Sequence, residues 1–263
     1  MEIGEILSDS FAYTKEAFVG KWVRWLIFII LGLPIALISI LYNNEMMMTG
    51  TKTSLENFPW AQIIALVVIG ILLSFFASGY IVRIYRGTKP APEFENWGDL
   101  FLDGLRMLIV TLLWMLPIIV IIVGAAAISV VVFAGAMDSS SSGLLFIVVL
   151  LIALLLAIVV GIIITLFATM GMIRFARTGS IREGIRFSMI KEHIGKIGWG
   201  NYIIALVVLF VVNLIFMIIV LIPSLIPVVG DVVSLIVSPL IMVFTARYYT
   251  LVYDLAGEPA ASG

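Results

Sequence analysis

Six long apolar stretches dominate the pattern of hydrophobic and polar positions along the chain. Each reaches the ~20 residues that an α-helix needs to cross the ~30 Å hydrocarbon core of a bilayer. The stretches are Trp22–Tyr42, Pro59–Val82, Leu105–Ala136, Leu144–Ile173, Trp199–Ile222 and Val232–Thr250. The pattern therefore predicts an all-α, polytopic integral membrane protein with six transmembrane helices.

The basic residues distinguish the two sides of the predicted membrane. Fourteen of the fifteen Lys and Arg residues lie near the termini or around the second and fourth gaps between the stretches, and only Lys52 lies in an odd-numbered gap. Because cytoplasmic segments carry the excess of Lys and Arg, both termini are predicted to be cytoplasmic. The expected location is the cell (plasma) membrane, which the chain would cross as a multi-pass protein.

Composition agrees with lipid as the main solvent. Of the 263 residues, 63% are hydrophobic and only 12% are charged, which is too apolar for the surface of a soluble domain of this size. Six spans and their connections use nearly the whole chain. We therefore expect a single membrane domain over residues 1–263, with residues 255–263 as a flexible C-terminal tail.

Three polar segments beside the stretches space their apolar residues as a helix does. They are residues 3–18, the segment that follows Pro92 and the segment that follows Ser180. Such spacing is typical of amphipathic helices in the membrane interface; Asn96 is expected to cap the second, and Ser180 with Glu183 has the spacing of a capping box on the third. The chain is thus predicted to form three pseudo-repeated hairpins, each preceded by a cytoplasmic-side amphipathic interfacial helix, over residues 1–86, 92–177 and 180–254.

Small residues recur at the same distances before the arginines that end the three returning spans, Arg83, Arg174 and Arg247. Rows of small residues four apart let membrane helices approach closely, so the returning spans are predicted to pack centrally by these faces. The alternative is that such residues are common in any membrane helix. The rows consist of Gly70, Ser74 and Ser78; Ala157, Gly161, Thr165 and Thr169; and Ser234 and Ser238.

Five arginines at the predicted inner boundary are candidates for contact with an anionic lipid headgroup or a phosphate. They are Arg83, Arg86, Arg174, Arg177 and Arg247. Arginine binds phosphate in a bidentate manner. The alternative is that they set the topology and extend to the interface. The most polar residue inside a span, Asn213, is expected to join helices by a hydrogen bond rather than to hold a substrate.

Signs of catalysis and of metal binding are missing from the sequence. The chain has no cysteine and a single histidine, His193, which is expected at the surface of the interface and cannot form a His-based metal site alone. Asp99 and Asp103 are expected on a solvated face or in an ion pair with Arg106. No phosphate-binding loop or nucleophile motif occurs. We expect no enzyme, no cofactor and, without a large basic patch, no nucleic-acid partner.

Two segments carry a family resemblance. Residues 79–83 and 92–106 read GYIVR and PEFENWGDLFLDGLR, and residues 174–176 and 179–183 read RFA and GSIRE. Together they resemble an archaeal and bacterial integral-membrane family known as domain of unknown function family 4013, with the stretch from Asn96 to Gly104 as the most specific part. The resemblance implies a prokaryotic cell-membrane protein without an assigned activity, and it brings no catalytic residues.

These features leave three functional hypotheses. The first is a non-catalytic membrane protein that organises lipid or a membrane complex, with membrane lipids, anionic headgroups at the inner leaflet, and a protein partner or a second copy as its partners. The second is a channel or carrier for a small, weakly charged or lipidic solute, and the third is a membrane-embedded enzyme. A cavity lined by Ser74, Thr165, Asn213 and Ser238 would favour transport, whereas dry packing of the small-residue rows would remove its route.

Overall fold

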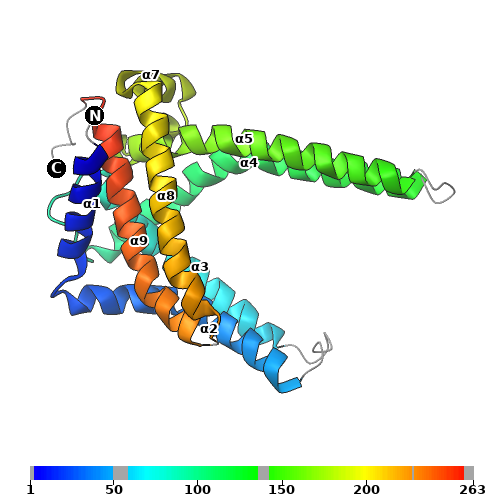
Figure 1. Cartoon of the computed structure of the whole chain (residues 1–263), viewed down its shortest axis with the longest axis horizontal. Helices are drawn as coiled ribbons and strands as arrows, with labels where there is room; N and C mark the ends of the chain where they lie inside the picture. Colours follow the sequence, from blue (N-terminus) through cyan, green and yellow to red (C-terminus); the bar gives the residue numbers. More distant parts are fainter. Residues whose placement is uncertain (1–2, 50–58, 136–141, 227, 258–263) are drawn as a thin grey trace. The chain divides into compact units, whose positions relative to one another are not determined.

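The computed structural model describes residues 3–49, 59–135, 142–226 and 228–257, and most of these residues are helical (Figure 1). No strand occurs in these ranges. The expected flexible tail lies largely outside them, because residues 258–263 are not described. The helices are α1 (Ile3–Phe18), α2 (Trp22–Thr49), α3 (Trp60–Tyr85), α4 (Trp97–Gly135), α5 (Ser142–Thr178), α6 (Ile181–Gly184), α7 (Phe187–Ile197), α8 (Trp199–Ser224) and α9 (Val229–Asp254).

Six of these helices are long and apolar enough to cross a membrane, which confirms the all-α class and the six predicted spans. The spanning segments are Trp22–Leu41, Trp60–Tyr85, Trp97–Val132, Leu144–Thr178, Trp199–Ser224 and Val229–Asp254. The protein is therefore a multi-pass membrane protein. The three-hairpin repeat and the placement of polar helices in the interface stay predictions.

Two of the predicted amphipathic helices have a different form in the structure. The segment after Pro92 makes no separate helix: α4 begins at Trp97, directly after Asn96, and continues without interruption into the third span. No proline stands between Trp97 and Pro117 to stop it. The segment after Ser180 is divided into the single turn of α6 and the longer α7. Ser180 does take the N-cap position of α6, but its side chain makes no capping hydrogen bond.

The chain divides into two compact units, which do not follow the boundaries of the predicted repeats. In the first unit, which comprises residues up to Leu108 and from Glu192 onward, α2, α3 and α9 pack against one another and α8 packs on α9. The Tyr248 hydroxyl joins α9 to α8 by donating to the carbonyl oxygen of Ala205 at 2.9 Å. α1 lies along α9 and buries Tyr13, Ala17 and Phe18 (Figure 1).

The second unit, Ile109–Lys191, contains most of α4, all of α5 and the turn of α6. Trp114 packs between helices as its indole nitrogen donates to the carbonyl oxygen of Gly184 at 3.0 Å. α4 and α5 also touch where the Thr111 hydroxyl lies 3.8 Å from the Met172 sulfur. Farther along, both helices expose large apolar side chains, such as Val131, which lipid can cover.

In the first unit, α3 and the first turns of α4 cross with their backbones in contact. A Cβ atom built on Gly79 would overlap the backbone carbonyl of Leu100, and one built on Gly104 would overlap the carbonyl oxygen of Phe75. Because only glycine lacks a Cβ, these two positions set how closely the helices approach.

Replacement of Gly104 by alanine should therefore lower the melting temperature of the purified protein, because the added methyl group cannot fit beside Phe75. Overpacking of this kind typically lowers stability by ~1–3 kcal/mol. Gly98→Ala is the matched control, since nothing lies within 4 Å of the added Cβ atom, and alanine favours the helix. Equal melting of the two variants would contradict the close crossing.

Candidate functional site

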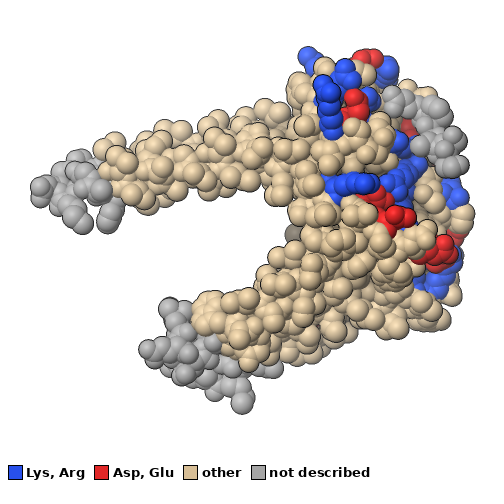
Figure 2. All heavy atoms as spheres, turned by 180° about the vertical axis from the view of Figure 1, so that it is seen from behind, with Lys and Arg blue, Asp and Glu red and all other residues tan. Residues whose placement is uncertain are grey.

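Charged side chains gather near one end of the long helices in each unit (Figure 2). In the first unit they lie on α1, at the start of α2, at the end of α3 and before α4, and in the second unit they lie at the end of α5 and on α6. We call these regions the basic ends. Exposed apolar residues such as Val67 and Leu155 occupy the lengths beyond them. A bilayer favours this separation because charge near its midplane is costly.

Two arginines at the basic end of α3 bind the segment that leads into α4. The guanidinium of Arg83 donates to the carbonyl oxygens of Glu93 and Glu95 at 2.9 and 2.7 Å. Arg86 pairs with the Asp103 carboxylate at 2.7 Å. Asp103 is buried, and its expected partner Arg106 stays 3.8 Å away; Arg86 is the closer partner.

Arg247 links α9 to α1. Its Nε atom lies 2.8 Å from an Asp9 carboxylate oxygen, and the side chain is only 2% exposed. Its Cζ atom lies 4.9 Å from the centre of the Tyr13 ring, and Lys89 binds the other Asp9 oxygen at 2.9 Å. Burial alone would raise the pKa of Asp9, but hydrogen bonds from Arg247 and Lys89 outweigh it and lower that pKa. Asp9 is therefore held as a carboxylate.

Arg174 makes a similar contact within the second unit. Two of its nitrogens donate to one oxygen of Glu183 at 3.0 and 2.6 Å, and Arg186 binds the other oxygen at 3.0 Å. The hydrogen bond from Arg174, then that from Arg186, lowers the pKa of Glu183. The residue expected to complete a capping box thus joins α6 to α5 instead.

Acceptors within the chain therefore bind several of the arginines predicted to contact anionic headgroups. Arg83, Arg86, Arg174 and Arg247 would each have to share or exchange such a partner to bind a phosphate. The fifth, Arg177, lies half-buried in the last turn of α5. These contacts favour a structural role for the arginines, and headgroup binding by them stays a prediction.

His193 corrects a prediction, because it is buried and not at the surface. Only 2% of the residue is exposed. Its ring stacks on Tyr253 with 3.8 Å between centroids, and its Nε2 atom lies 3.0 Å from the Tyr253 carbonyl oxygen. The charges of Lys191 and Glu192 suggested a solvated face, but His193 shares the apolar stripe of α7 with Ile194 and Ile197. Helical spacing is the signal that could have placed it.

The small-residue rows of α3 and α9 line a cavity of ≈ 500 Å³, which we call the α2–α3–α9 groove. Gly70 and Ser74 face it from α3, and Ser234 and Ser238 face it from α9. Asn213, half-buried on α8, does not line it. The rest of the lining is Phe28, Leu31, Gly32, Ile35, Ala36, Ser39, Ala77, Asp231, Leu235, Pro239 and Met242.

The row on α5 belongs to the second unit, and its threonine hydroxyls donate to the backbone of the same helix. The Thr165 hydroxyl donates to the Gly161 carbonyl oxygen at 2.8 Å, and the Thr169 hydroxyl donates to the Thr165 carbonyl oxygen at 3.1 Å. Gly161 lies 3.9 Å, measured from an ideal Cβ, from Ile118 of α4. These hydroxyls thus already have acceptors, and the predicted central packing of the three rows stays a prediction.

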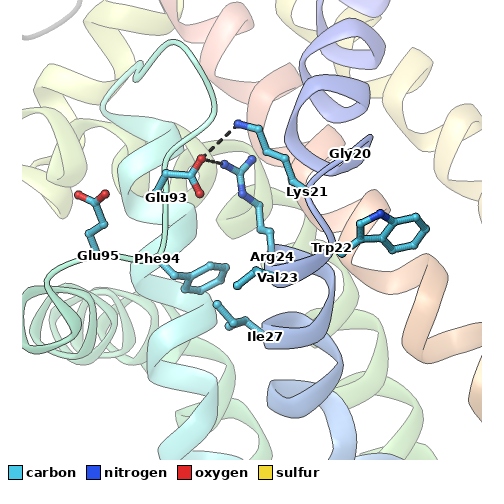
Figure 3. A pocket seen from close by; sticks show the side chains of 9 residues that line it. All are labelled: Gly20, Lys21, Trp22, Val23, Arg24, Ile27, Glu93, Phe94 and Glu95. Atoms are coloured by element: carbon cyan, nitrogen blue, oxygen red, sulfur yellow. Dashed lines mark hydrogen bonds and ion pairs between the residues drawn. The ribbon is translucent and has the colours of Figure 1, made fainter.

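A second pocket, of ≈ 570 Å³, lies at the start of α2, and we call it the Lys21 pocket (Figure 3). It was not predicted from the sequence. One oxygen of Glu93 accepts from Lys21 at 3.2 Å and from Arg24 at 2.6 Å. The hydrogen bond from Arg24 is the main reason that the pKa of Glu93 is lowered. The available signal was Arg24 itself, an arginine inside the first apolar stretch. The pocket is lined by Gly20, Lys21, Trp22, Val23, Arg24, Ile27, Glu93, Phe94 and Glu95.

Comparison with known proteins identifies a family. The pattern of a family described as "Protein of unknown function (DUF4013)" matches residues 62–227, which is more than half of the chain. The match includes the Gly79–Gly104 crossing and the contacts of Arg83, Arg86 and Arg174, whereas α2 and α9 lie outside it. No curated protein and no solved structure matches the chain.

Removal of the Arg247 guanidinium should loosen α1 from α9. We expect Arg247→Leu to lower stability by about 2–3 kcal/mol, less than the ~3–5 kcal/mol of a fully buried pair, because Asp9 keeps Lys89 and some solvent. Arg106→Leu, a half-exposed arginine with a distant partner, is the control. Thermal unfolding and proteolysis of α1 measure the effect.

The pH dependence gives a second readout of the same pair. Because the folded pKa of Asp9 is lowered, its stabilisation is present above the ~3.9 of an unfolded aspartate and is lost as pH falls through the folded value. The difference between the wild type and Arg247→Leu should therefore shrink below about pH 4. A difference that stays constant in acid would show that Asp9 is not the partner that matters.

Proposed function

The chain belongs to the family described as "Protein of unknown function (DUF4013)", and we propose that it is a non-catalytic membrane protein that holds a lipid or a comparable apolar amphiphile in the α2–α3–α9 groove. The observation that carries this proposal is the groove itself. It lies among three membrane-spanning helices and has a volume of ≈ 500 Å³, within the ~300–1,000 Å³ typical of ligand pockets.

The shape of the groove comes from small residues on its walls. Gly32 and Ala36 on α2 and Gly70 on α3 leave room that larger side chains would fill. Along α2 the lining runs from Phe28 to Ser39, a length of ~17 Å at the rise of an α-helix. An extended hydrocarbon chain fits a narrow apolar groove of this length.

Polar groups in the groove favour an amphiphile over a plain hydrocarbon. Serines line it on all three helices, and Asp231 lies in the first turn of α9. Asp231 is the single ionisable residue among the described lining residues. General acid–base catalysis normally uses more than one such group, so this lining supports binding rather than chemistry.

A carrier for a lipidic solute is the second candidate, and one observation favours it. The groove and the Lys21 pocket lie on either side of an aromatic cluster formed by Phe28, Tyr80 and Phe94. Phe28 lies 5.1 Å from Tyr80 and 5.0 Å from Phe94, and Tyr80 stacks on Phe94 at 4.7 Å between ring centres. Movement of these rings would join the two cavities along α2.

Filling the groove tests the proposal. Ser74→Phe should reduce the lipid that co-purifies with the protein several-fold, as measured by mass spectrometry after gentle extraction, because the ring would occupy the cavity. Ile71→Phe is the control on the same helix, since Ile71 is exposed and does not line the groove. Equal lipid retention by both variants would contradict the proposal.

Reconstituted vesicles distinguish a protein that only binds a lipid from one that moves it across the membrane. If the protein only binds its ligand, a headgroup-labelled lipid should not move between leaflets faster than in protein-free vesicles. Movement that is accelerated by the protein and blocked by Ser74→Phe would favour the carrier.

A further inference from the structure

The Lys21 pocket is separate from the groove and has a different chemistry. Phe94 lines the Lys21 pocket and Phe28 lines the groove, and their rings are in contact between the two cavities. Four charged residues line the Lys21 pocket: Lys21, Arg24, Glu93 and Glu95. The groove has one. A ligand of the Lys21 pocket is therefore selected mainly by charge.

The charges of the pocket cancel. Two are positive and two are negative, so an anion attracted by Lys21 also meets Glu95, and a cation attracted by Glu95 also meets Lys21. A group that carries both charges gains from both contacts when each charge lies nearer to its opposite than to its like. Glu93 and Glu95 lie on the same loop; the Glu93 side chain points toward Lys21 and Arg24, Glu95 lies on its other side, and the Phe94 ring points toward Ile27 (Figure 3).

Arg24 fixes this arrangement from below the surface. Its side chain is 1% exposed, and it donates to the Ala17 carbonyl oxygen at 2.7 Å as well as to Glu93. Its Nε atom is buried without an acceptor among the described residues. A buried charge with an unsatisfied donor is costly to keep. Because Arg24 contacts Glu93 from a buried position, it acts as a positioning residue for that carboxylate.

The groups that a ligand can reach are on Lys21, Glu93 and Glu95. The ammonium of Lys21 has three N–H donors and gives one to Glu93, so donors remain for a phosphate. Both contacts of Glu93 use the same oxygen, and its side chain is 54% exposed. Its second oxygen and the exposed Glu95 carboxylate remain for a cation, which would also lie near the Phe94 ring.

We propose that the Lys21 pocket binds a phosphate joined to a primary ammonium, as in a phosphoethanolamine headgroup. The phosphate lies on Lys21, and the ammonium lies between Glu93 and Glu95. A primary ammonium donates hydrogen bonds to both carboxylates, whereas a quaternary ammonium has no N–H to donate, so ethanolamine is favoured over choline.

The surroundings of the pocket favour a lipid as the source of this group. Trp22 and Val23 are 80% and 73% exposed, and Trp22 points away from the ion pair of Lys21 and Glu93 (Figure 3). Exposed tryptophan at the end of a span is typical of the membrane interface. Acyl chains attached to the headgroup would run along this apolar wall.

The test uses the full-length protein in nanodiscs that contain phosphatidylcholine with an equal share of phosphatidylethanolamine or phosphatidylglycerol. Native mass spectrometry measures the lipid that stays bound. The wild type should retain phosphatidylethanolamine at least fivefold better than either other lipid. Glu95→Gln and Lys21→Gln should abolish this preference, and Glu95→Gln should also increase retention of phosphatidylglycerol.

Matched variants and a soluble probe complete the experiment. Glu16→Gln and Lys15→Gln change exposed charges on α1 that do not line the pocket, and they should leave the preference intact. A saturable melting shift with soluble phosphoethanolamine, lost in Lys21→Gln, would support the same chemistry with a soluble source. A wild type that prefers phosphatidylglycerol, or a preference unchanged in both pocket variants, would overturn the proposal.

Discussion

A guanidinium group that is removed from water must have a partner, and the basic ends of this protein depend on that constraint. Arg24 and Arg247 are each only 2% exposed, so the loss of hydration would be prohibitive without acceptors. Arg24 forms an ion pair with Glu93, and Arg247 forms one with Asp9. These contacts join α2 to the loop before α4, and α9 to α1. Charged contacts thus add to apolar packing in holding α1 and the loop before α4 in place.

Two cavities of the first unit differ in chemistry because of where these charges lie. At the basic end, Arg24 and Lys21 hold Glu93 beside the start of α2 and form the Lys21 pocket. Deeper along the helices there are no arginines, and small residues such as Gly70 and Ser234 leave the α2–α3–α9 groove. One cavity thus offers paired charges and the other offers an apolar channel with hydroxyl groups. The two cavities therefore suit ligand groups of different chemistry.

Local pattern was enough to predict the class of this protein but not its long-range contacts. The six spans followed from apolar length alone, and Arg83 and Arg174 marked the ends of two returning spans. Asp9 and Arg247 lie 238 residues apart, and no periodicity connects them. His193 was misplaced because neighbouring charges were weighed above its helical position. The close crossing at Gly104 could not be predicted either, because a glycine in a sequence does not show which backbone it packs against.

The charge bias predicts that the basic end of each unit faces the cytoplasm, and this prediction can be measured directly. The chain has no cysteine, so single cysteines can be introduced without background. In intact cells, a membrane-impermeant maleimide should label Thr53→Cys in the first gap but not Thr88→Cys or Ser188→Cys until the membrane is opened. Labelling of Thr88→Cys or Ser188→Cys from outside the cell would contradict the topology and, with it, the inner placement of the Lys21 pocket.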